Sequence, residues 1–126
     1  MKRPLKNPKR YQPNRMPLGR RIVYFLFSLF AIGWAVHGLA GNDLLCSFQG
    51  RNPLHANKLT DYHFHGPAAW LMAASIICVA ISFLTEVVDH YDKRNNESVY
   101  DRVGFFFLAA GIVFCALGAA AYKVWN

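Results

Sequence analysis

The side chains best suited to chemistry lie close together in residues 61–65, where Asp61, His63 and His65 alternate with two aromatic residues. Alternate side chains of an extended segment point to the same side, so these three would share one face. Imidazole and carboxylate groups are common ligands of zinc and copper. The spacing therefore matches half of a zinc or copper site, to which His55 or His37 adds a further ligand.

Two other interpretations of this stretch stay open. In the first, Tyr62 and Phe64 anchor the segment at a membrane–water interface, and the polar residues face water or lipid headgroups. In the second, His37 and His65 ligate a haem. The haem interpretation is the weaker of the two, because no paired histidines lie deep within facing helices. The interfacial anchor is the simplest interpretation, so we expect no cofactor, with zinc or copper as the alternative.

The chain contains no arrangement typical of an enzyme. It has no Ser-His-Asp order, no paired catalytic carboxylates and no Gly-rich phosphate loop. Of the three cysteines, Cys78 and Cys115 fall in apolar segments, where a thiol packs as a small apolar group. We therefore expect a protein without catalytic activity of its own.

Three apolar segments must position these residues, and they span about 22–40, 67–88 and 103–122. Each is close to the ~20 residues that a helix needs to cross the hydrocarbon core of a bilayer. None shows the polar stripe of a soluble amphipathic helix. The sequence predicts an all-α membrane protein whose residues 22–126 form a small bundle of three transmembrane helices.

Two loops connect the predicted spans. In the longer loop, 41–66, Pro53 follows Asn52 and favours a short helix over residues 53–59. The first residues of this loop, 43–45, suggest a helix-capped or interfacial stretch. The shorter loop, 89–102, is mixed in charge.

Basic residues are concentrated before the first span. Residues 1–21 hold eight of the 14 Lys and Arg residues and no acidic residue, so they carry +8; the remaining residues sum to −1, which gives the net charge of +7. Lys and Arg collect on the cytoplasmic side of membrane proteins. The distribution predicts a multi-pass protein of the cytoplasmic (inner) membrane, with the N-terminus and loop 89–102 inside, and loop 41–66 and the C-terminus outside.

The basic segment 1–21 is expected to be a flexible cytoplasmic tail, because its four prolines prevent a stable helix. Its main role is to set the topology. Arg15, Arg20 and Arg21 are also predicted to bind anionic lipid headgroups. Basic charge confined to a tail argues against a nucleic-acid partner.

A cleaved signal peptide over residues 1–40 is an alternative interpretation. Residues 38–40, Gly-Leu-Ala, match the small-x-small pattern before a cleavage site. The apolar segment is longer than that of a typical signal peptide, and the basic region is long and rich in proline. These features favour a retained transmembrane helix.

Small residues repeat along one face of each span, and such faces let helix backbones approach closely within a membrane. The first span has Ser28, Ala31, Ala35 and Gly38 at spacings of three and four. The predicted packing faces of the other two spans are Ala74, Cys78 and Ser82, and Gly104, Gly111, Cys115 and Gly118. Mutual packing of these faces is the simplest prediction, and docking of a partner is the second.

These observations favour a non-catalytic accessory or assembly subunit of a larger membrane complex. Its expected partners are membrane lipids and another membrane protein or a second copy of the chain. The metal site in the outer loop is one alternative. A homo-oligomeric channel or transport helper is another, with Ser75, Ser82 or Thr85 lining the pore. No acidic or basic residue lies at the midplane of a span, which argues against an ion path within one subunit.

Overall fold

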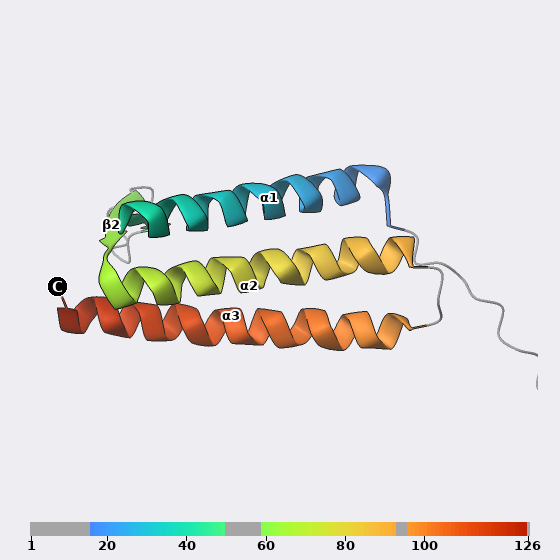
Figure 1. Ribbon diagram of the computed structural model, residues 1–126. Helices are drawn as coiled ribbons and strands as arrows, with labels where there is room; N and C mark the ends of the chain where they lie inside the picture. The colour runs from blue at the N-terminus through green and yellow to red at the C-terminus, as the bar shows by residue number, and fades with distance from the viewer. Residues whose placement is uncertain (1–15, 50–58, 93–95, 126) are drawn as a thin grey trace, which may run out of the picture.

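Three long helices and one β-hairpin make up the computed structural model, which describes residues 16–49, 59–92 and 96–125. The elements follow in the order α1 (Leu18–Gly41), β1 (Leu44–Gln49), β2 (Leu59–Phe64), α2 (Gly66–Tyr91) and α3 (Glu97–Trp125). Successive helices run in opposite directions (Figure 1). The end of the molecule that carries the two strands is called the hairpin end, and the opposite end, where α3 begins, the far end.

All three helices are long and apolar enough to cross a membrane. They extend beyond the predicted spans at both ends, most clearly in α3, which begins at Glu97 rather than at 103. The mostly helical, multi-pass architecture predicted from the sequence is therefore confirmed. Many large apolar side chains on the outer surfaces of the helices are exposed, as expected for residues that face lipid.

Helix α2 lies between the other two helices (Figure 1). The three helices therefore form an open row rather than a closed bundle. Within the described residues, α1 and α3 each pack along α2 and make at most marginal contact with each other. The buried residues of α1 are Ser28, Ala31, Ala35 and Gly38, which confirms the predicted stripe. The Ser28 hydroxyl donates hydrogen bonds to the carbonyl oxygens of Ala80, at 3.0 Å, and Tyr24, at 2.8 Å.

The glycines of α3 lie against α2. A Cβ added at Gly104 would come 2.8 Å from Thr85 Oγ1, and one at Gly118 would come 2.8 Å from Met72 Sδ. At Gly111 it would lie 3.2 Å from the carbonyl oxygen of Ser75. The Ser75 hydroxyl donates to the Gly111 carbonyl at 2.7 Å, so the two backbones approach closely enough to be joined by one side chain.

The central helix buries two faces rather than one. Cys78 and Ser82 lie near Gly111 and Gly104, whereas Ala74 is half-buried and Cys115 packs at the edge of the core. The buried residues of α2 form a larger set: Ala68, Ala69, Met72, Ala73, Ser75, Ala80, Val87 and Asp89. A single small-residue stripe describes α1 but is insufficient for a helix with a neighbour on each side.

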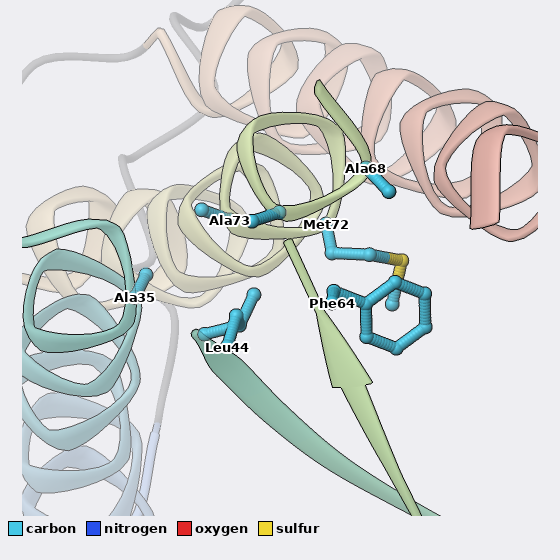
Figure 2. Close-up of a cluster of buried hydrophobic side chains, with 7 residues drawn as sticks. Ala35, Leu44, Phe64, Ala68, Met72 and Ala73 are labelled. Carbon is cyan, nitrogen blue, oxygen red and sulfur yellow. The ribbon is translucent and has the colours of Figure 1, made fainter. Parts of the chain in front are cut away.

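The hairpin packs two of its side chains onto the helices. Leu44 and Phe64 face each other at the start of the antiparallel ladder and are both buried. They join Ala35, Met72 and neighbouring alanines of α2 in the hydrophobic core at the hairpin end (Figure 2). This cluster joins the hairpin to α1 and α2.

The hairpin corrects two expectations for loop 41–66. Residues 44–49 form a strand rather than a helix-capped stretch, and Leu59, the last residue of the predicted short helix, begins β2. Residues 50–58 lie outside the described residues. Pairing between segments distant in sequence supplies the backbone hydrogen bonds here, and local composition does not reveal such pairing.

Gly38 is required for the contact between α1 and the hairpin. A Cβ at this position would meet the Leu44 side chain and come 3.1 Å from Leu44 Cα, whereas a Cβ at Gly33 of the same helix would meet nothing within 4 Å. We expect Gly38→Ala to lower the free energy of unfolding by about 1–3 kcal/mol through overpacking. Gly33→Ala should leave it unchanged or raise it by up to about 1 kcal/mol.

Thermal unfolding of both variants in the same detergent measures this difference. Equal destabilisation by the two alanines would show that Leu44 does not pack on α1 as described.

Candidate functional site at the hairpin end

Asn42 connects the end of α1 to the start of α2. It adopts the left-handed conformation (φ 50°) that ends α1, and the Asp43 backbone N–H donates to the carbonyl of Gly38 at 3.0 Å. The Asn42 side-chain oxygen accepts a hydrogen bond of 2.9 Å from the backbone N–H of Gly66, which also has a positive φ of 54°. This short turn positions the neighbouring histidines.

His63 in β2 and His65, just after this strand, lie side by side. Each ring turns its Nδ1 atom toward this turn. His63 Nδ1 lies 2.9 and 3.0 Å from the two carboxylate oxygens of Asp43, and His65 Nδ1 lies 2.8 Å from the carbonyl oxygen of Asn42. The rings stack with centroids 6.4 Å apart. Both acceptors require an N–H donor, so each Nδ1 carries the proton and each Nε2 is left for another partner.

The predicted third ligand is engaged elsewhere. Ser47, which faces Asp61 across the hairpin, donates a hydrogen bond of 2.5 Å to the Asp61 carboxylate. Within residues 16–49, 59–92 and 96–125 no group of three or more His, Cys, Asp or Glu side chains is placed to hold a metal ion. His55 lies outside the described residues. The structure therefore brings together His63, His65 and Asp43, and the sequence analysis did not include Asp43.

An apolar groove of about 510 Å³ lies beneath the hairpin. Phe30 and Trp34 of α1 form one wall, Cys115 of α3 borders it on the other side, and Met72 and Ile76 of α2 contribute to its lining. Strand β1 covers it, held by a 3.1 Å hydrogen bond from Trp34 Nε1 to the Leu45 carbonyl. The groove exists because α1 and α3 do not meet over α2.

A second cavity of about 320 Å³ adjoins the groove. It shares Phe48, Met72 and Cys115 with the groove and reaches Tyr122 and Lys123 near the end of α3. The hairpin thus crosses an extended apolar surface rather than filling it.

The two described arginines predicted to bind headgroups have partners within the chain. Arg20 Nη2 lies 3.4 Å from Glu86 Oε2, and Arg20 Nε donates to the Tyr24 hydroxyl at 2.9 Å. Arg21 Nε donates to the Met16 carbonyl at 3.1 Å. Arg15 lies outside the described residues. Arg20 and Glu86 are both about half exposed, so this ion pair stabilises the fold only weakly.

Comparisons with protein families, curated proteins and solved structures found no match to this chain.

The thiol of Cys46, in β1, is half-buried, which predicts a slow reaction with alkylating agents. Burial raises the pKa of Cys46, and the neighbouring Cys115 adds to the effect. A raised pKa keeps the thiol protonated at neutral pH, where only the thiolate reacts with alkylating agents. We expect Cys46 to react with a maleimide several-fold more slowly than an exposed cysteine, and to gain reactivity as the pH rises.

The matched control is Thr60→Cys in a Cys46→Ala background, which places a thiol at an exposed position of the same hairpin. Equal rates for the two thiols at neutral pH would contradict the shielded position of Cys46.

Proposed function

We propose that this chain is a multi-pass protein of the cytoplasmic membrane that serves as a non-catalytic accessory or assembly subunit of a larger membrane protein. The observation that carries this proposal is the open groove beneath the hairpin. The uneven distribution of basic residues supports an inside N-terminus, which puts the hairpin and the groove at the outer side of the membrane.

The groove suits an apolar side chain and backbone of a partner helix. In a bilayer, burial of apolar surface alone does not drive association, and helices associate through shape and close packing. Ser75 and Cys115, which are small, line the groove together with Met72 and Ile76, while the stacked rings of Phe30 and Trp34 form a wall. Small residues beside an aromatic wall permit close approach by a helix that presents a complementary side chain.

The described residues favour docking over a channel. Ser75 already donates its hydroxyl to the Gly111 carbonyl, and Thr85 donates to the Ser82 carbonyl at 2.7 Å. These hydroxyls therefore face backbone partners rather than a pore, and the groove beside α2 is lined mainly by apolar groups.

Site-specific photo-crosslinking tests the docking face. Phe30 lines the groove and is 69% exposed, whereas Phe106 of α3 lies outside the groove and is 66% exposed. A photoreactive phenylalanine analogue placed at each position offers nearly the same accessibility. Irradiation of intact cells should give one discrete protein adduct from position 30 and none from position 106.

Protein adducts from both positions, or lipid adducts alone from position 30, would contradict docking through this groove. Thermal stability of both labelled proteins, measured in the same detergent, shows that each is folded.

A metal site at the two histidines is a second candidate function, favoured by the shared orientation of His63 and His65. Metal-binding histidines commonly donate one ring N–H to a carboxylate or backbone carbonyl, which fixes the ring and directs the other nitrogen to the metal. Asp43 and the Asn42 carbonyl provide these acceptors. Two imidazoles leave room for further ligands, and zinc or copper is the class of ion that they fit.

Zinc binding to the purified protein tests this second candidate. We expect His63→Ala with His65→Ala to abolish saturable zinc binding, and Asp43→Asn to weaken it by about 10-fold through loss of the orienting carboxylate. His90→Ala, at the far end, is the control. Zinc binding that survives the double substitution would contradict a site at this pair.

A further inference from the structure

A small polar cavity at the far end, between α2 and α3, has no role in the functions proposed above. Its volume is about 210 Å³, and three carboxylates line it: Glu86 and Asp89 from α2 and Asp101 from α3. The side chains of Ser82 and Thr85 contribute further oxygen atoms. Close packing at Gly104 brings the two helices together here, because a Cβ at Gly104 would come 2.8 Å from Thr85 Oγ1.

Asp89 is the unusual member of this set. Its side chain lines the cavity although the residue is only 4% exposed, and its Oδ1 atom is buried without a hydrogen-bond partner in the described part of the chain. A buried carboxylate without a donor costs several kcal/mol, so native proteins almost always pair such groups. The Oδ1 atom of Asp89 therefore has room for a cationic or N–H partner from outside the described residues.

Arg20 does not supply the missing partner of Asp89 Oδ1. Arg20 pairs with Glu86 at 3.4 Å from the side of α1. Among the described residues no salt bridge reaches Asp89 or Asp101. Two of the three carboxylates thus have no cationic partner among the described residues.

The spacing of the acceptors indicates the chemical class of ligand. No three acidic side chains of the described residues are close enough to surround a metal ion. An ammonium group offers three N–H donors and a guanidinium offers five, so one organic cation can bridge carboxylates and hydroxyls that are further apart. The cavity volume of about 210 Å³ is large enough for such a cation, because one water molecule occupies about 30 Å³ in the liquid.

We propose that this cavity binds a protonated amine through Asp89 and Asp101. The cation is either a free amine of the polyamine type or a Lys side chain of another protein chain. The proposal does not depend on the docking groove, which lies at the other end of the molecule. Each can therefore fail without the other.

Spermidine is the probe for the free-amine source, with the full chain in uncharged phosphatidylcholine nanodiscs so that lipid headgroups do not bind it. We expect saturable binding that Asp89→Asn weakens by at least about 10-fold, as for loss of a charge-assisted hydrogen bond. Asp101→Asn should weaken binding less, because Asp101 is exposed. Glu97→Gln, which removes a nearby charge outside the cavity, should leave the affinity unchanged.

Carbodiimide cross-linking in native membranes, read by mass spectrometry, tests the side-chain source. An Asp89- or Asp101-dependent cross-link to a lysine of another chain supports that source, and spermidine binding without such a cross-link supports a free amine. Two results would overturn the proposal. One is absence of both spermidine binding and an interchain cross-link; the other is a cross-link from Asp89 to Lys93 of the same chain, which makes Asp89 part of an internal ion pair.

Melting temperatures, measured with and without spermidine, give a second test and show whether each variant is folded. Asp89→Asn removes a buried carboxylate with an unpartnered oxygen, so it should not lower the melting temperature without ligand. Spermidine should raise the melting temperature of the wild type and of Glu97→Gln more than that of Asp89→Asn. Equal stabilisation of wild type and Asp89→Asn by spermidine would also overturn the proposal.

Discussion

The close approach of α2 to a neighbour on each side is the constraint on which the rest of the structure depends. Within lipid, no water is present to satisfy polar groups, so hydrogen bonds between helices must do so. The hydrophobic effect does not hold helices together there, so they associate through close packing at small residues. Ser28 links α1 to the Ala80 carbonyl of α2, and Ser75 links α2 to the Gly111 carbonyl of α3. These two contacts lie on different faces of one helix and fix the order α1–α2–α3.

Three features follow from this order. Because α1 and α3 do not meet, a groove stays open beside α2, and the hairpin crosses it with Leu44 and Phe64 buried in the core. At the far end, the same close packing of α2 and α3 at Gly104 encloses the carboxylate of Asp89. The molecule thus presents an apolar site at one end and an acidic one at the other, joined by the central helix.

The sequence predicted the helices well because the bilayer imposes a simple rule of length and composition. The stripe of α1 was also predictable, since a helix with one neighbour needs only one small-residue face. The two faces of α2 were not, because residue spacing does not reveal how many neighbours a helix has. Strand β1 and the role of Asp43 depend on pairing between distant segments. The burial of Asp89 depends on α3 lying beside α2, which residue spacing does not reveal.

The central claim is that this chain docks another membrane protein through the groove beside α2. Native mass spectrometry of the protein released directly from its own membranes tests it without detergent exchange. The account predicts a complex of fixed stoichiometry with one larger membrane protein, and loss of that complex when Ile76→Trp fills the groove. Release of the wild-type chain only as a monomer with lipids, or a complex that Ile76→Trp leaves intact, would contradict it.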